Sequence, residues 1–336
     1  MHLSRHTSAA IETRVPAQVG LINTTRTVDT SAASRYKLSW GYPMRRRPFH
    51  VLVATDGSRQ ARAAMAATLA FPWPHATRAQ GVMVSGVPRL SRWRKRAREA
   101  LLDWLRRETM RVQRTLRRRW ADAEVVVAAP PIANAIVERA DRWRAQVIVL
   151  GSRGRGSLQS ALMGSVSRDV MHEANCAVLV IKGRARTPQR FLIGLDGSSR
   201  SRRAVAFVSR VPPPARGRVT LLSVIEPTRA TSIRPMPAYV RDVLVAELAA
   251  LDRARLAKAR REVSTAARRL KRAGWDVEKV VRSGIPLPEI LRTASSKRAD
   301  IIVVGARGAG GLSRLLLGSV AEGTFAHASV PVLVVK

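Results

Sequence analysis

The sequence is short of cysteine, aromatic residues and acids, and it has no long apolar stretch. One cysteine, Cys176, among 336 residues excludes an internal disulfide framework and a zinc site built from several cysteines. Aromatic residues make up only 4% of the chain and hydrophobic residues 46%, which favours small aliphatic α/β cores over an aromatic-rich β-sandwich. No apolar stretch approaches the roughly 18 residues of a membrane-spanning helix. We therefore expect a cytoplasmic globular protein.

The shortage of acids leaves a large excess of positive charge. Lys and Arg together number 60 against 23 Asp and Glu, which gives a formal net charge of +37. Net charge alone reports non-specific attraction, so two interpretations stay open. One is an arginine-rich proteome, and the other is a partner such as a nucleic acid or an anionic membrane surface.

The first 47 residues differ in composition from the rest. They are rich in Ser, Thr, Ala and Arg, contain only Glu12 and Asp29 as acids, and show no sustained hydrophobic period. We expect residues 1–47 to form a basic, disordered extension. Two alternatives are a transit peptide and a misassigned start, with translation beginning at Met44.

From Phe49 onward, one order of elements is written twice. Each copy opens with an apolar run, an Asp-Gly-Ser turn and a helical stretch, FHVLVATDGS at residues 49–58 and FLIGLDGSS at residues 191–199. Each ends with a glycine loop, a helix and an aliphatic strand. The elements between are a second strand (81–87; 219–225), a long basic helix (91–120; 238–273), a third strand (124–128; 277–281), a short helix and a fourth strand (QVIVLG; DIIVVG).

Alternating strands and helices, with continuous aliphatic runs as strands, indicate parallel sheets covered on both faces. The sequence therefore predicts two doubly wound, Rossmann-like α/β domains at residues 48–182 and 191–336, with a linker at 183–190. The Asp-Gly-Ser turns lie 140 residues apart and the glycine loops 154 residues apart. The second copy is thus 14 residues longer, and we place the extra residues at 226–237.

The glycine loops read GSRGRGSLQSALMGS from Gly151 and GARGAGGLSRLLLGS from Gly305. Each follows an aliphatic strand, and its final Gly-Ser pair opens a helix, so each lies at the carboxyl edge of a sheet, where open α/β folds bind ligands. A helix N-terminus there favours an anion such as a phosphate. Neither loop is a Walker A motif or a Gly-x-Gly-x-x-Gly fingerprint. Glycine-rich turns with Ser caps are the structural alternative, but two copies in equivalent places favour a ligand site.

These motifs together resemble the universal stress protein family in a tandem form. The resemblance rests on Gly-x2-Gly-x9-Gly-Ser after a DIIVVG-type strand, on VATDGS and GLDGSS, and on the ending PVLVVK. The glycine pattern resembles that of the family's ATP-binding subclass. The resemblance implies a five-stranded parallel sheet of order 3-2-1-4-5 in each copy, with ATP across its carboxyl edge and a Mg or Mn ion on the phosphates.

The resemblance also implies roles for individual residues. Asp56 and Asp196 would face the adenosine part of ATP, although an Asp before a helix is also a common N-cap. Val224, at the end of the second strand, would contact adenine. Ribose and phosphates would be held by Gly151, Gly154, Gly164 and Ser165 and by their partners Gly305, Gly308, Gly318 and Ser319.

The first copy departs from the family pattern at three positions. Gly86 replaces the valine of the second strand, Pro130 stands where the second copy has Gly284, and Ala177 replaces Pro331. The second copy is therefore the closer match, and weaker ATP binding by the first is an open alternative.

Residues 89–119 contain 13 Lys or Arg and three acids, with apolar residues at helical spacing. We interpret this helix as covering the sheet with a solvated outer face; a surface for nucleic acid or anionic lipid is the alternative. The apolar stripe comprises Trp93, Ala97, Leu101, Trp104, Val112, Leu116 and Trp120.

Catalytic residues are not evident. No Ser-His-Asp or Cys-His arrangement is suggested, the six histidines lack metal-ligand spacing, and neither loop brings a carboxylate base or Lys toward a γ-phosphate. We expect an ATP-binding regulatory stress protein that is not an enzyme beyond slow ATP hydrolysis. Its halves should pack as an intramolecular pseudo-dimer with AVLVIK beside PVLVVK, and a homodimer is possible. The alternative is a basic stress protein that binds nucleic acid or membranes.

Overall fold

The structure is a computed structural model and describes residues 48–84, 95–128, 130–152, 164–183, 186–228, 237–306 and 317–336. The chain divides into two compact units, Met1–Arg45 and Arg46–Lys336, and every described residue belongs to the second. The extension expected at residues 1–47 lies outside the described residues.

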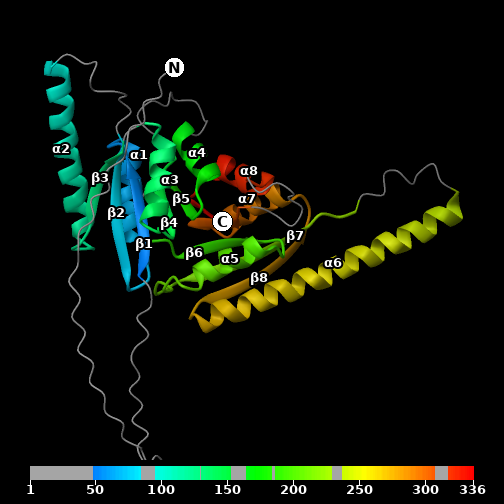
Figure 1. Cartoon of the computed structure of the whole chain (residues 1–336). Coiled ribbons are helices and arrows are strands. Elements are labelled where there is room, and N and C mark those ends of the chain that lie inside the picture. Colours follow the sequence, from blue (N-terminus) through cyan, green and yellow to red (C-terminus); the bar gives the residue numbers. More distant parts are fainter. Residues whose placement is uncertain are drawn as a thin grey trace, which may run out of the picture. The chain divides into compact units, whose positions relative to one another are not determined.

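Within the described residues, the first copy of the repeat contains five strands and four helices (Figure 1). They are β1 (Phe49–Thr55), α1 (Arg59–Ala70), β2 (Thr77–Val84), α2 (Lys95–Arg117), β3 (Glu124–Ala128), α3 (Ile132–Arg142), β4 (Val147–Gly151), α4 (Ser165–Glu173) and β5 (Ala177–Ile181).

The second copy repeats this order in its described part. Its elements are β6 (Arg190–Leu195), α5 (Ser199–Val208), β7 (Arg218–Ile225), α6 (Ala238–Arg272), β8 (Asp276–Ser283), α7 (Pro286–Ser296), β9 (Ile301–Gly305), α8 (Ser319–His327) and β10 (Val332–Val335).

The strands form one sheet in the order β3-β2-β1-β4-β5-β10-β9-β6-β7-β8. Each copy therefore has the expected order 3-2-1-4-5, and neighbouring strands within a copy run parallel. Only continuous apolar runs can serve as strands buried on both faces, and the runs VIVLG of β4 and IIVVG of β9 meet that requirement. The doubly wound fold predicted from the sequence is confirmed.

The last strands of the two copies pair with each other, as predicted. β5 and β10 are antiparallel, with Leu179 opposite Leu333 and Val180 opposite Val332. Leu333 is also the repeat equivalent of Leu179, since both lie at an offset of 154 residues. A residue that faces its own equivalent lies on a two-fold axis, so the register itself defines the pseudo-two-fold relation of the two copies.

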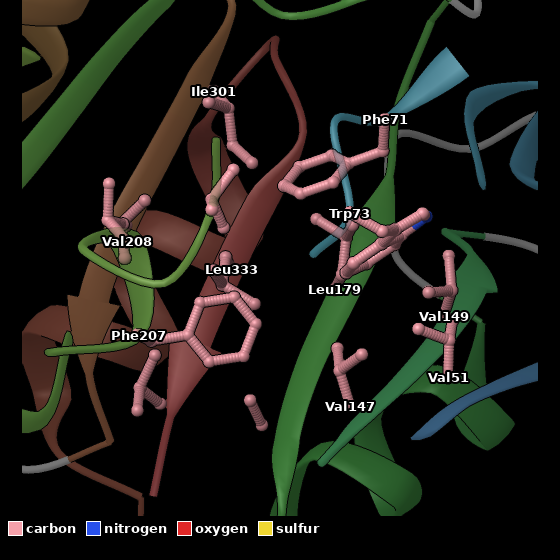
Figure 2. Close-up of a cluster of buried hydrophobic side chains, with 14 of the residues drawn as sticks. Val51, Phe71, Trp73, Val147, Val149, Leu179, Phe207, Val208, Ile301 and Leu333 are labelled. Atoms are coloured by element: carbon pink, nitrogen blue, oxygen red, sulfur yellow. The ribbon is translucent and has the colours of Figure 1, made fainter. Parts of the chain in front are cut away.

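The core is shared by the two copies. On one face of the sheet, α1, α2, α5 and α6 cover a continuous cluster of buried side chains, in which Phe71 and Leu179 lie near Phe207 and Leu333 (Figure 2). Phe49 meets Phe207 edge to face, with ring centroids 5.6 Å apart, and Phe71 meets Phe191 at 6.2 Å. All five phenylalanines of the chain are buried, and four of them belong to this cluster. The second cluster lies under α3, α4, α7 and α8.

The first residues of each copy are tied to its fourth strand in the same way. Asp300, directly before β9, accepts hydrogen bonds from the main-chain N–H groups of Gln189 and Arg190. Gln146, its repeat equivalent before β4, accepts one from the N–H of His50. Asp300 also pairs with the Arg186 guanidinium at 3.0 Å, so its carboxylate anchors the segment that joins the copies.

The extra length of the second copy falls partly in a different place from the one expected. α6 has 35 residues and the described part of α2 has 23. Counting back from the paired strands β3 and β8, Lys95 at the start of α2 corresponds to Ala249, which lies eleven residues inside α6. The insertion therefore extends the helix as well as the segment 226–237. β2 also differs from its prediction: it begins at Thr77, because Phe49 pairs with Thr77 in the ladder.

Candidate functional site

The candidate site lies at the carboxyl edge of the sheet, once in each copy. The chain proceeds from β1 to β2 and β3 on one side and then crosses to β4 and β5 on the other, so β1 and β4 flank the point where the strand order reverses. Open α/β sheets bind ligands at such a point. Asp56 follows β1 and Gly151 ends β4, whereas Asp196 and Gly305 hold the same places in the second copy.

Asp56 and Asp196 shape the turn before a helix, but neither is the N-cap. Asp56 Oδ1 accepts the N–H of Ser58 at 2.9 Å, and Asp196 Oδ1 accepts that of Ser198 at 3.0 Å. The caps are the two serines, because Ser58 Oγ accepts the N–H of Ala61 and closes the first turn of α1. The alternative that each Asp serves only as a helix cap is therefore wrong.

Two arginines that the sequence analysis passed over brace these turns. Arg62 donates to the carbonyl oxygen of Gly57 at 2.6 Å, and Arg202 donates to that of Gly197 at 2.6 Å. Both glycines have left-handed backbones, with φ of 74° and 75°. The signal was present in the sequence, since each arginine stands six residues after its Asp.

The first glycine of each loop has a packing role. A β-carbon on Gly151 would lie 3.0 Å from the carbonyl carbon and oxygen of Gln60 in α1. One on Gly305 would lie 2.9 Å from main-chain atoms of Arg200 and Ser201 in α5. Glycine at these positions lets the start of the helix approach the end of the neighbouring strand, and this packing sets where the Asp-bearing turn lies.

The last glycine of each loop opens a helix. Gly164 N–H donates to the carbonyl of Ser152 at 3.1 Å, and Gly318 N–H donates to that of Ala306 at 2.8 Å, so each loop begins and ends at one hydrogen bond. Their φ angles are −66° and −72°, which any residue adopts. Backbone conformation therefore does not require glycine here. The first-turn N–H groups of α4 and α8 receive no side-chain cap, and Ser165 and Ser319 are exposed beside them.

The charge beside these helix starts differs between the copies. Arg168 lies in the first turn of α4, and its repeat equivalent in α8 is Glu322. Glu322 lies 3.9 Å from His172 of the first copy. A cation near the phosphate site of α4 favours an anionic ligand, whereas Glu322 opposes one at α8. This difference can be read from the sequence once the helix starts are known.

Val224 lies near the end of β7, is half-buried and packs on the second core cluster. The ladder pairs Leu195 with Ser223 and Thr55 with Met83, so the residue equivalent to Val224 is Val84. The substitution of this valine by Gly86 in the first copy is therefore wrong, because Gly86 lies two residues further along the chain. The first copy keeps a valine, which removes one of its three departures from the family pattern.

The structure thus brings together, in each copy, the Asp turn, the end of the fourth strand and the Gly-Ser helix start. Gly154 and Gly308 lie outside the described residues, as do the rest of residues 153–163 and 307–316. The other two departures remain: Pro130 stands at the place of Gly284, and Ala177 at that of Pro331.

The basic helix α2 covers the sheet with its C-terminal half. Leu105, Val112 and Leu116 are buried, and Leu101, Trp104 and Trp120 pack against the core. Ala97 is exposed, which corrects its assignment to the inner stripe, and Trp93 lies outside the described residues. Glu108 is 6% exposed and pairs with Arg111. Arg119 donates to the carbonyls of Leu69 and Phe71, and burial lowers the pKa of its guanidinium.

Other candidate groups carry no chemistry. Burial, with Asp141 as the next cause, raises the pKa of the Cys176 thiol to about 12, so this side chain is an unreactive part of the core. Within the described residues, no cluster of three or more His, Cys, Asp or Glu side chains is placed to hold a metal ion. No helix in the described parts of the chain is long and apolar enough to cross a bilayer.

Comparison with known proteins identifies relatives of both copies. The model of the universal stress protein family matches residues 49–182 and 188–336. Universal stress protein Rv2005c of Mycobacterium tuberculosis is 35% identical over 204 residues, which is 57% of this chain and 62% of that protein. Universal stress protein MJ0531 of Methanocaldococcus jannaschii is 48% identical over 63 residues, 19% of this chain and 37% of that one. The chain therefore spans less than two thirds of the length of the curated relatives it matches.

Solved structures share the fold of the whole repeat. A universal stress protein from Archaeoglobus fulgidus is similar with a TM-score of 0.56 and 21% identity, covering 85% of this chain and 96% of that one. A putative universal stress protein from Pseudomonas aeruginosa gives a TM-score of 0.51 with 17% identity, covering 86% and 94%. At these identities the likeness concerns the fold alone.

Proposed function

Because the chain belongs to the universal stress protein family, in which its two copies form one tandem unit, we propose that it binds ATP at the carboxyl edge of each copy and acts as a nucleotide-responsive regulatory protein. Nucleotide occupancy, with at most slow hydrolysis, is the signal in this proposal. The glycine pattern, which resembles that of the family's ATP-binding subclass, motivates the choice of nucleotide.

The observation that carries the proposal is the helix start at Gly164 and Gly318. Neither glycine is needed for its backbone angles, and neither supplies a cap, yet both stand at the switch point of the sheet with an exposed serine next in the chain. A ligand that approaches the main chain closely explains the lack of a side chain. Free first-turn N–H groups and the helix dipole favour a negatively charged group, by about 0.3–1 kcal/mol at an exposed helix end.

The remaining site residues fit the other parts of a nucleotide. Asp56 and Asp196 lie at the ends of the strands adjacent to Val84 and Val224, so a carboxylate and an aliphatic side chain come together at the edge. A carboxylate can accept hydrogen bonds from ribose hydroxyls, and a valine can pack on a purine ring. Gly151 and Gly305 set the position of the Asp turn through their contact with α1 and α5.

A divalent ion fits this site only on the phosphates. With no cluster of three ligands among the described residues, the chain offers too few side chains to hold an ion alone. Mg²⁺ commonly binds through substrate phosphates, water and one or two carboxylates, so Mg²⁺ or Mn²⁺ would enter with ATP. Such an ion would neutralise phosphate charge.

Slow turnover is expected because the described part of the site lacks a base for the attacking water. α4 has no acid in its first turn, and Glu322 in α8 lies toward His172 of the other copy. Fast phosphoryl transfer requires a residue that orients the nucleophile and cations that stabilise the transferred group.

Both copies should bind. The second follows the glycine pattern more closely, but the first keeps its valine and has Arg168 where the second has Glu322. Equilibrium dialysis of the full chain, stripped of nucleotide, with labelled ATP and Mg²⁺ tests the proposal. Near two ATP per chain supports it, and no saturable binding refutes it.

A second candidate rests on the start of α2. Lys95, Arg96 and Arg98 are exposed at the end of this helix that extends beyond its buried part. A polyanion held by such a surface would be released steeply as salt rises. Binding of RNA or of anionic vesicles that falls steeply with salt, and is lost in a Lys95→Ala, Arg96→Ala, Arg98→Ala variant, would support this function.

A further inference from the structure

The first half of α6 carries apolar side chains on a surface that the described fold does not cover. Tyr239 is 75% exposed, Val243 63%, Val245 49% and Leu251 51%. The buried residues of α6 are Val263, Ala267 and Leu270, all near its C-terminal end. A helix segment with exposed large apolar residues and no buried ones is the mark of an interaction site.

The charges of α6 are divided along its length. Residues 238–252 hold three acids and one base, in a chain whose formal charge is +37. Residues 253–261 hold five bases and no acid. The acids are Asp242, Glu247 and Asp252, and the bases of the second stretch are Arg253, Arg255, Lys258, Arg260 and Arg261.

This division argues against an anionic partner at the exposed apolar residues. Helices that lie on membranes, and surfaces that bind nucleic acid, place Lys and Arg around the contact, whereas here Arg241 is the one base among residues 238–252. The local excess of acid instead requires a basic partner. The next turns of the same helix, on a second copy of the chain, supply one.

We propose that α6 pairs with α6 of a second copy as an antiparallel helix dimer about a two-fold axis near Leu251. Val240, Leu244, Glu247 and Leu251 are spaced by four, three and four residues, which places them along one seam of the helix. About that axis, Leu251 meets Leu251 of the second copy. A symmetric, self-complementary contact of this kind closes at two chains.

Charge selects the antiparallel direction. Four residues before the axis is Glu247, and four residues after it is Arg255, so the two lie at the same level in the antiparallel pair, with Lys258 of the second copy one turn away. A parallel pair would instead set Glu247 against Glu247 and Arg255 against Arg255. Like charges at that spacing destabilise helix pairs. This proposal does not depend on nucleotide binding.

Cross-linking of the full chain tests the geometry. In a Cys176→Ala background, Leu251→Cys should be joined to a second copy by a short bis-maleimide. Val243→Cys should not, because eight residues on each side of the axis separate the two thiols by about 24 Å along an antiparallel pair. Equal cross-linking of both variants would mean a parallel pair and would overturn the proposal, as would no cross-linking of Leu251→Cys.

Solution mass provides the second test. The full chain at micromolar concentration and moderate salt should be a dimer in analytical ultracentrifugation, and Leu251→Arg should shift it toward the 36.9 kDa monomer. Met110→Arg is the matched control, since Met110 is 54% exposed on α2. Glu247→Lys should weaken the dimer at least tenfold, and adding Lys258→Glu should restore it. A monomeric chain, or a dimer that Leu251→Arg leaves intact, would contradict the proposal.

Discussion

Lys182, which follows the last strand of the first copy, donates to the carbonyl oxygen of Phe325 at the end of α8 in the second copy, with Nζ 2.5 Å from the oxygen. It also reaches the carbonyl of Ala328 at 2.7 Å. Lys336, its repeat equivalent, contacts the carbonyls of Met171 and His172 at the end of α4. Each copy thus places a cation at the C-terminus of the helix whose N-terminus is the other copy's candidate phosphate site.

Lys182→Met should destabilise the protein by roughly 1–2 kcal/mol, because it removes a charge-assisted hydrogen bond and a cation at a helix C-terminus. Lys336→Met should act similarly. The measurement is urea unfolding followed by circular dichroism, with Lys279→Met at an exposed position as the control. Lys182→Met and Lys279→Met curves that coincide would show that the contact contributes nothing.

Asp300→Asn should lower stability at neutral pH by roughly 1–3 kcal/mol, because a hydrogen-bonded, buried carboxylate is lost. Burial alone would raise the pKa of Asp300, but the N–H of Arg190, the Arg190 guanidinium and the N–H of Gln189 outweigh it and lower this pKa below its ordinary 3.8. The carboxylate therefore stabilises the fold above about pH 4, and its contribution disappears as the pH falls through the lowered pKa.

Urea unfolding of the wild type and of Asp300→Asn at pH 7 and at pH 3 measures this. The difference in unfolding free energy should be smaller at pH 3. Asp276→Asn, in a pair whose Asp is 62% exposed, should change stability little at either pH. A deficit in Asp300→Asn that is the same at both pH values would show that the charge is not what stabilises this junction.

Gly305→Ala should destabilise by roughly 1–3 kcal/mol, because its β-carbon would lie 2.9 Å from the main chain of α5 and would force the helix away from β9. Gly194→Ala is the matched control in β6, where the new β-carbon would lie 3.5 Å from Val304, an ordinary contact. Thermal unfolding distinguishes the two. If both variants unfold at the wild-type temperature, the helix start is not tightly packed on the strand.

Regular elements were predictable where one physical signal dominates. Four buried valines and isoleucines in a row mark β4 and β9, and the bounds of α1, Arg59–Ala70, follow from a serine cap and a repeating alanine face. The start of β2 was missed because Thr77 and Arg78 are polar, and only pairing with β1 makes them part of the strand. The strand order followed from the family resemblance, since spacing alone does not determine it.

The candidate site was predictable as a set of residues but less so as a set of roles. Gly151 and Gly164 look alike in the sequence, yet one packs against α1 and the other opens α4. That difference depends on what lies across from each glycine in space. The packing of Phe49 on Phe207 was likewise hidden, because the two residues come together only when β5 pairs with β10.

The most direct test of nucleotide binding is calorimetric titration of the stripped full chain with ATP and Mg²⁺. We would compare the wild type with Gly164→Ala/Ser165→Ala, Gly318→Ala/Ser319→Ala and Gly194→Ala. Saturable binding that each loop variant reduces by about one site, and that Gly194→Ala leaves unchanged, is the result we predict. Absence of binding, or binding that survives both loop changes together, would reduce the loops to structural turns and contradict the proposed function.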